Sequence, residues 1–359
     1  VWDIKNKKLY LIRDRFGEKP LYYGWSNGVF LFGSELKALQ AYKNFNNIVD
    51  RNALSLYMQY MYVPTPYSIF KDVYKLDPGC ILQIDNDGIN KPPSRIMSSA
   101  FCAKGVSIKQ WYSLSNIAEK SQHNLIKDKH ESVELLEKAL TESIQSQLIS
   151  DVSLGAFLSG GIDSSIIVSL MQSISMNPVK TFTIGFEDSL FNEAIYAKDV
   201  AKHLGTEHHE LYVTASDAIR VIPDLPILYD EPFADSSQIP TYLVSKLARE
   251  NVTVSLSGDG GDELFGGYNR YLWGERVWSK LKWMPPVVRQ TLGAIIQKLP
   301  VSTLDTVGHL LPNRYKVTTM GDKAHRMAHR LNIVNTIDDM YRSLVTEGFN
   351  EESMVYSDD

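Results

Sequence analysis

The sequence predicts an α/β domain with a mostly parallel sheet, preceded by a smaller α+β region rich in antiparallel strands. From about residue 131, apolar runs of strand length alternate with helical patterns, as in a parallel sheet that is covered on both faces. Before residue 90, short strands follow one another closely. A third observation is the apolar run 154–158, which ends at a Gly-Gly turn and leads directly into a helical pattern.

The N-terminal region is predicted to contain three strands, a helix and a further hairpin. Asn27-Gly28 separates the second and third strands and is the dipeptide preferred in a tight hairpin turn. Apolar residues at i, i+3, i+4 and i+7 predict a helix over 50–62, which Pro64 ends. The strands are expected at 8–13, 20–24 and 29–33, and the further hairpin at 74–87.

Residues 91–130 show no sustained period, so we expect a linker there. The predicted domain boundaries are therefore 1–90, 91–130 and 131–359. The α/β region opens with an amphipathic helix over about 133–148. Its strands are expected at 154–158, 179–186, 208–213 and 252–256, and its later helices at about 193–204 and 240–250.

Composition excludes several classes of partner. The formal net charge is −5, which gives no basis for binding nucleic acid or an anionic membrane surface. Cys80 and Cys102 are too few for a disulfide framework or a cysteine metal site, so we expect the reducing cytoplasm. No apolar run reaches the roughly 20 residues of a membrane span. Val1 is not an initiator methionine, and we expect a fragment cut at both ends.

The turn at residues 159–165 has the composition of a phosphate site. Gly160 and Gly161 allow a close backbone approach, and the following helix offers unpaired N–H groups and the positive end of its dipole. Ser159, Ser164 and Ser165 add hydroxyl groups. An ordinary β-to-α turn would explain a bare Gly-Gly pair, but not three hydroxyls and a carboxylate around it. A P-loop is excluded because no lysine has the required spacing.

A second polar loop follows the strand at 252–256. It contains Asp259, Asp262 and Glu263 among glycines, and turn formation alone would explain such a composition. If Asp163 and Asp262 face each other, however, two charges about 4 Å apart repel by about 4 kcal/mol at an effective dielectric near 20. A Mg²⁺ ion bridging carboxylates and phosphate oxygens would relieve this repulsion. The two loops therefore predict a site for a nucleotide with Mg²⁺, with pyrophosphate seated on residues 159–165.

These motifs carry a family resemblance. Residues 159–164 resemble the S-G-G-x-D-S pyrophosphate loop of N-type ATP pyrophosphatases, and 257–268 resemble the second signature of glutamine-dependent asparagine synthetases. Residues 13–23 and 34–39 resemble the late part of that family's N-terminal-nucleophile glutaminase domain. The resemblance implies a PP-loop, adenine nucleotide α-hydrolase-like domain, incomplete at its C-terminus, after the C-terminal part of a class II glutamine amidotransferase domain.

The resemblance also implies an activity and its partners. Such enzymes, which are carbon–nitrogen ligases, adenylate the side-chain carboxylate of aspartate with Mg-ATP and release pyrophosphate. Ammonia from glutamine then displaces AMP to give asparagine. Aspartate, ATP and glutamine or ammonia are therefore the expected partners, with a homodimer as a candidate assembly.

The implied roles fall on eleven residues. Asp259 stands where many relatives have glutamate and would assist proton removal as ammonia attacks. Asp163 and Asp262 would hold magnesium. The pyrophosphate and adenosine contacts would come from Leu158, Ser159, Gly160, Gly161, Asp163, Ser164, Ile184, Ser257 and Gly258.

One departure and two alternatives accompany the resemblance. No cysteine nucleophile stands at the N-terminus, so we expect no glutamine hydrolysis from this sequence. Residues 230–237 lie where the acceptor would be recognised, with no single residue assigned. The acceptor therefore stays open, and a β-lactam-forming or polysaccharide-amidating relative is an alternative, as is a non-catalytic nucleotide-binding protein. His208 and His209 are expected to be structural, because neighbouring strand residues point to opposite faces.

Overall fold

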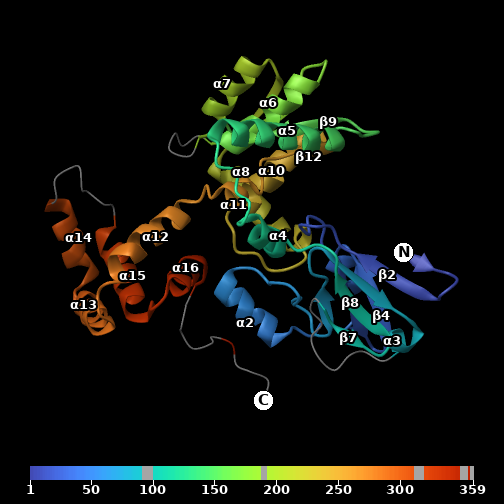
Figure 1. Ribbon diagram of the computed structural model, residues 1–359, viewed down its shortest axis with the longest axis horizontal. Coiled ribbons are helices and arrows are strands. Elements are labelled where there is room, and N and C mark those ends of the chain that lie inside the picture. Colours follow the sequence, from blue (N-terminus) through green and yellow to red (C-terminus); the bar gives the residue numbers. More distant parts are fainter. Residues whose placement is uncertain (91–99, 187–191, 311–318, 348–354, 356–359) are drawn as a thin grey trace. The chain divides into compact units, whose positions relative to one another are not determined.

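The computed structural model describes residues 1–90, 100–186, 192–310, 319–347 and 355. These residues form two compact units, one with residues 1–57 and 62–261, the other with residues 58–61 and the chain from 262 on. The first unit contains an antiparallel α+β part and a parallel α/β part (Figure 1). The predicted fold class is therefore confirmed.

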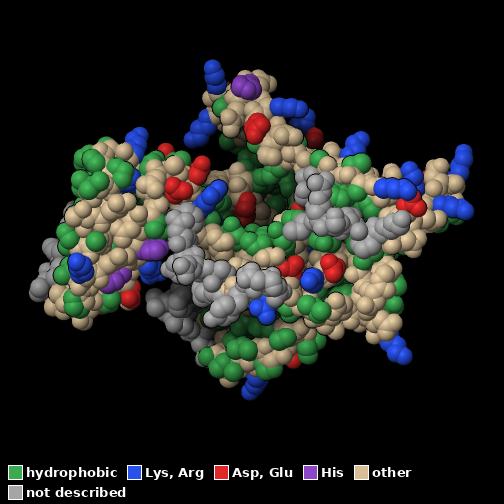
Figure 2. Space-filling model, turned by 90° about the horizontal axis from the view of Figure 1, so that it is seen from below, with side chains coloured by type: hydrophobic (Ala, Val, Ile, Leu, Met, Phe, Trp, Pro, Cys, Tyr) green, Lys and Arg blue, Asp and Glu red, His purple; other side chains and the backbone are tan. Residues whose placement is uncertain are grey.

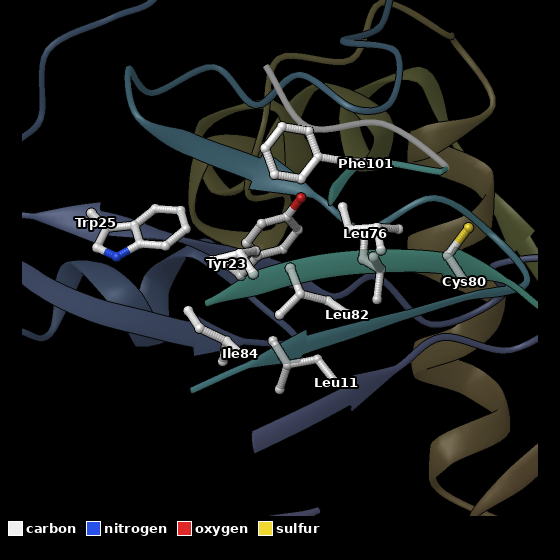
Figure 3. Packing of buried hydrophobic residues seen from close by; sticks show 10 residues of the cluster. Leu11, Tyr23, Trp25, Leu76, Cys80, Leu82, Ile84 and Phe101 are labelled. Atoms are coloured by element: carbon white, nitrogen blue, oxygen red, sulfur yellow. The ribbon is translucent and has the colours of Figure 1, made fainter. Parts of the chain in front are cut away.

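The N-terminal part contains two antiparallel sheets that pack face to face. Their shared core includes Leu11, Tyr23, Leu82 and Ile84 (Figure 3). The first sheet has the order β1-β2-β6-β8-β7 and the second the order β4-β3-β5. The strands are β1 (Trp2–Asp3), β2 (Lys8–Ile12), β3 (Tyr22–Ser26), β4 (Val29–Gly33), β5 (Val73–Lys75), β6 (Cys80–Ile84), β7 (Cys102–Ala103) and β8 (Val106–Gln110).

Strand β3 is buried along its whole length because both faces of its sheet are covered. Tyr23 faces the five-stranded sheet, whereas Tyr22 packs with Leu36 and Ala53 from the helices on the other face. The predicted tight turn is also present, since Asn27 and Gly28 between β3 and β4 both have positive φ. The helices of this part are α1 (Leu36–Gln40), α2 (Arg51–Tyr60), α3 (Asn86–Asn90) and α4 (Leu114–Ser121).

Two predictions for this part were wrong. The expected hairpin over 74–87 does not form, because β5 pairs with β3 whereas β6 pairs with β2 and β8. The stretch expected to be a linker contains β8, which extends the larger sheet. Both errors have one cause: a two-residue apolar period indicates a strand but not its sheet, and β8 has only Val106 and Ile108 as buried residues.

The α/β part is built on a four-stranded sheet in the order β11-β10-β9-β12, and every neighbouring pair is parallel. The strands are β9 (Leu154–Phe157), β10 (Lys180–Phe186), β11 (Glu207–Val213) and β12 (Val254–Leu256). They agree with the predicted strands to within about two residues at each end. The strands' carboxyl ends consequently meet at one edge of the sheet.

Helices cover both faces of this sheet. One face packs against α5 (Lys129–Gln147), α6 (Ile162–Ile174) and α7 (Ala194–Leu204), which lie together in Figure 1. The other packs against α8 (Ala215–Val221) and α10 (Gln238–Arg249). Between these two helices the chain forms η1 (Ile222–Asp224) and α9 (Leu225–Leu228). Helix α7 ends at Gly205, which is in the left-handed region.

The second unit is helical in its described residues. Its core contains Leu281, Leu331, Val334 and Met340. The helices are α11 (Gly261–Phe265, which begins at the end of the first unit), α12 (Asn269–Leu281), α13 (Pro286–Lys298), α14 (Val301–Leu310), α15 (Met320–Ile333) and α16 (Ile337–Val345).

On the face drawn in Figure 2, both Lys and Arg and Asp and Glu side chains are present, and several Lys and Arg side chains gather at the right of the view. Within the described ranges, no helix is both long enough and apolar enough to cross a bilayer.

Tyr23 provides a test of the N-terminal core. Its side chain is fully buried, and its hydroxyl, which points toward Phe101 in Figure 3, has no hydrogen-bond partner among the described residues. Because an unpaired buried hydroxyl costs about 1–3 kcal/mol, we expect Tyr23→Phe to raise the free energy of unfolding by about 1 kcal/mol. Urea unfolding, monitored by hydrogen exchange of the β3 amides, measures this change in the free energy of unfolding.

Tyr22→Phe is the matched control on the same strand. The Tyr22 hydroxyl donates to Glu231 Oε2 at 3.3 Å, so its removal should lower the free energy of unfolding by about 1 kcal/mol. A loss of stability in Tyr23→Phe would contradict the assignment of an unpaired hydroxyl.

Candidate functional site

The turn between β9 and α6 is shaped by two glycines with different constraints. Gly160 has φ +80°, and a Cβ there would lie 2.7 Å from the backbone of Tyr196 and Ala197 at the start of α7. Gly161 has φ −69° as the residue that precedes α6. A Cβ on Gly161 would meet only the Ser159 hydroxyl, at 3.2 Å. The fold thus requires a glycine at 160, whereas the space beside Gly161 stays available for a ligand.

Serine hydroxyls hold this turn. Ser159 Oγ and Ser164 Oγ share a hydrogen bond of 2.9 Å, and Ser159 Oγ accepts from the Gly161 amide at 3.2 Å. Ser164 is buried, whereas Ser159 is exposed. Helix α6 has 13 residues, and its first-turn N–H groups lack helical acceptors. A turn with an exposed serine and helix-terminal amides is able to bind an anion.

The structure brings the second loop against this helix, because β12 pairs directly with β9. A Cβ on Gly258 would lie 2.7 Å from the amide nitrogen of Ser164, and one on Gly261 would lie 2.6 Å from the carboxylate carbon of Asp163. The two polar loops predicted from the sequence therefore meet, and Asp163 lies where they touch.

The remaining carboxylates of the second loop are placed as follows. Ser257 Oγ donates to Asp259 Oδ2 at 3.0 Å, which holds this exposed carboxylate near the strand end. Asp262 is half-buried and follows Gly261 directly in the chain. Among the described residues, no group of three or more His, Cys, Asp and Glu side chains is arranged to hold a metal ion. A site of one or two carboxylates leaves coordination positions for phosphate oxygens, as Mg²⁺ commonly requires.

Leu158 and Ile184, expected together in an adenosine pocket, have side chains on opposite faces of the sheet. Leu158 is 1% exposed and packs with residues of α5, α6 and α7. Ile184 is half-buried in the cluster that includes residues of α8 and α10. The structure therefore does not bring the two side chains together, and Leu158 is able to reach a ligand only through its backbone.

The adjacent histidines of β11 both have structural contacts. His208 Nδ1 lies 2.9 Å from Thr181 Oγ1, and the His209 ring stacks on Phe182 with centroids 5.2 Å apart. Burial lowers the pKa of the His208 imidazole below its usual value of 6.5, against the attraction of Glu210. A half-buried imidazole with a lowered pKa is consistent with a structural residue.

Sequence reasoning missed one polar cluster of the first unit. Glu231 lies in the stretch expected to recognise the acceptor, yet its carboxylate pairs with Lys75 of β5 at 2.6 Å. A signal was present in the sequence. Lys75 occupies the same strand face as the buried Val73, and a lysine at a buried position requires an acidic partner.

The half-buried His208 predicts a pH dependence of stability. The unfolded chain binds a proton near pH 6.5, whereas the folded imidazole resists it, so stability falls as the pH drops below that value. We expect His208→Asn to reduce the loss of unfolding free energy between pH 7 and pH 5, measured by urea titrations. His130→Gln, at an exposed position, is the control and should leave the loss unchanged. An equal loss in wild type and His208→Asn would contradict the assignment.

Comparison with known proteins gives two family matches. The asparagine synthase model matches residues 135–353, and the glutamine amidotransferase domain model matches residues 1–94. A putative asparagine synthetase [glutamine-hydrolyzing] 2 of Methanocaldococcus jannaschii is 37% identical over 304 residues, which are 84% of this chain and 54% of the relative.

Two further relatives are similar over most of the chain. Asparagine synthetase [glutamine-hydrolyzing] 1 of Bacillus subtilis is 36% identical over 272 residues, 76% of this chain and 39% of the relative. A putative asparagine synthetase [glutamine-hydrolyzing] of Mycobacterium bovis is 32% identical over 307 residues, which are 84% of this chain and 43% of the relative. The chain spans about half the length of these curated relatives. Because the first family model covers well over half of the 359 residues, the chain belongs to the asparagine synthase family.

Proposed function

We propose that this protein carries out ATP-dependent asparagine synthesis. The side-chain carboxylate of aspartate attacks the α-phosphorus of ATP, pyrophosphate leaves, and ammonia derived from glutamine displaces AMP to give asparagine. The observation that carries the proposal is the close packing of Gly258 and Gly261 on Asp163. It brings a carboxylate loop to an anion-binding turn, at the carboxyl edge of a parallel sheet where ligands bind.

The residues at this edge fit ATP with Mg²⁺. The open space beside Gly161 and the hydroxyl of Ser159 suit a pyrophosphate group, with Gly160 and Ser164 completing the turn. Asp163 and Asp262 would hold the magnesium ion, which would neutralise charge on the phosphates. Backbone atoms of Leu158 and Gly258 would face the adenosine, with Ser257 and Ile184 as further candidates.

Within this proposal, the chain's own groups have separate tasks. The amides at the start of α6 bind the phosphates and stabilise the charge that develops on the leaving pyrophosphate. Asp259, held by Ser257 at 3.0 Å, accepts a proton from the nitrogen as ammonia attacks. Its shorter side chain has one methylene less reach than a glutamate would have.

We also propose how the chain divides between the two half-reactions. Residues 1–90 belong to a glutamine-using domain and 131–359 to the synthetase domain, in line with the two family models. The strand pair β7–β8 extends the sheet of the first domain, so the connection between the two domains begins after residue 110.

Acceptor identity is tested by the exchange of labelled pyrophosphate into ATP over a panel of carboxylic acids. We expect exchange with aspartate, and Asp163→Asn should lower it at least 100-fold, because loss of a charged contact to the metal ion costs about 3 kcal/mol or more. Exchange with another acid but not with aspartate would favour a related amidotransferase. ATP binding without exchange on any acid would indicate a non-catalytic nucleotide-binding protein.

The two turn glycines predict different outcomes on replacement by alanine. Gly161→Ala should keep the melting temperature within about 2 °C, because its φ suits any residue, but should weaken ATP binding at least 10-fold. Gly160→Ala should lower the melting temperature as well, because of its positive φ and its contact with α7. Calorimetric titration and thermal unfolding measure the two effects. Normal ATP binding by Gly161→Ala would contradict the phosphate site.

A further inference from the structure

The segment between α9 and α10 sends two neighbouring carboxylates, Asp230 and Glu231, into the N-terminal part of the first unit. We call them the 230–231 carboxylate pair. Glu231 accepts from three groups: Lys75 Nζ at 2.6 Å, the Ile69 amide at 2.8 Å and the Tyr22 hydroxyl at 3.3 Å. A single carboxylate thus joins three separate stretches of the N-terminal part to the synthetase part.

Asp230 makes a second set of contacts beside it. Its Oδ2 accepts from the Leu36 amide at 2.9 Å, at the start of α1, and its Oδ1 lies 3.4 Å from Lys37 Nζ. Lys37 also donates to the carbonyls of Ile227 and Leu228, at 3.1 and 3.3 Å. The carboxylate pair therefore has contacts along α1, β3, β5 and the chain that precedes β5.

The ion pair between Lys75 and Glu231 is largely shielded from solvent. Each side chain is only 11% exposed, and Lys75 also donates to the carbonyl of Val63. Burial lowers the pKa of Lys75, and the carboxylate of Glu231 opposes this effect. Removing one partner of such a pair leaves an uncompensated buried charge, whereas removing both does not.

The carboxylate pair belongs to the segment that leads into helix α10. Helix α10 runs back from Gln238 to β12, which is parallel to β9. The start of α10 therefore lies at the carboxyl edge, as does the turn at 159–164, and residues 229–237 lead from the carboxylate pair to it. The segment also borders a cavity of about 370 Å³. Residues lining it include Tyr62, Val63, Lys75, Tyr229, Glu231 and Phe233.

We propose that Glu231 is a positioning residue for the acceptor: anchored by Lys75, Tyr22 and Ile69, it fixes the conformation of residues 229–237, which lead to the edge where the acceptor binds. This inference rests on the proposed function. Loss of the anchor frees the segment and weakens acceptor binding. It leaves the ATP turn unchanged, since that turn is held by its own serine hydrogen bonds.

The test compares Glu231→Gln, Lys75→Met and the double variant in the protein, with ammonia as the nitrogen donor and pyrophosphate release as the readout. Each single variant should raise the KM for aspartate at least 10-fold and leave the KM for ATP within twofold. The double variant should be less impaired than the product of the two single effects. Lys198→Met removes the ion pair between the exposed Lys198 and Glu210 and is the matched control, expected to change neither constant.

Two results would overturn the proposal. One is an unchanged KM for aspartate in Glu231→Gln, and the other is an equal rise in both KM values, which would indicate general disruption. Hydrogen exchange supplies a readout that does not depend on activity. The amides of 229–237 should exchange at least 10-fold faster in Glu231→Gln, with no change in α6, and unchanged exchange in the segment would also overturn the proposal. If the wild type releases no pyrophosphate with aspartate, the proposed function fails. Hydrogen exchange of the 229–237 amides still decides whether Glu231 anchors the segment.

Discussion

The candidate site depends on a contact that only glycine permits. The loop after β12 reaches the first turn of α6 because Gly258 and Gly261 have no side chain, and a Cβ at either position would lie within 2.7 Å of Asp163 or Ser164. That approach turns two separate strand ends into one surface with hydroxyls, amides and carboxylates together. Parallel pairing of β12 with β9 sets the two loops side by side. The absence of Cβ atoms at Gly258 and Gly261 then allows the loops to pack in direct contact.

A second constraint links this edge to the N-terminal part. Strand β3 is buried on both faces, so its position is fixed by two layers of packing at once. Tyr22 on this strand and Lys75 on the neighbouring β5 both reach Glu231. The polar contacts between the two parts therefore start from well-packed strands, which limits how far the segment before α10 is able to move.

The sequence was sufficient for features set by local period and turn chemistry. Alternation of strands and helices predicted the parallel sheet, and Asn27-Gly28 predicted the β3–β4 turn. It was insufficient wherever the answer depended on which distant segment is the partner. Apolar alternation in β5 and β6 could not reveal that they join different sheets. The packing of Leu158 and Ile184 on opposite faces and the partner of Lys75 likewise depend on tertiary contacts.

The buried pair of Lys75 and Glu231 has a consequence for how this sequence is able to diverge. Replacing one of the two residues leaves an unpaired charge in a site where each side chain is only 11% exposed. A lineage that loses one residue therefore regains stability by losing the other. Positions 75 and 231, separated by 155 intervening residues of chain, should therefore vary together across relatives: both ionic, or both neutral.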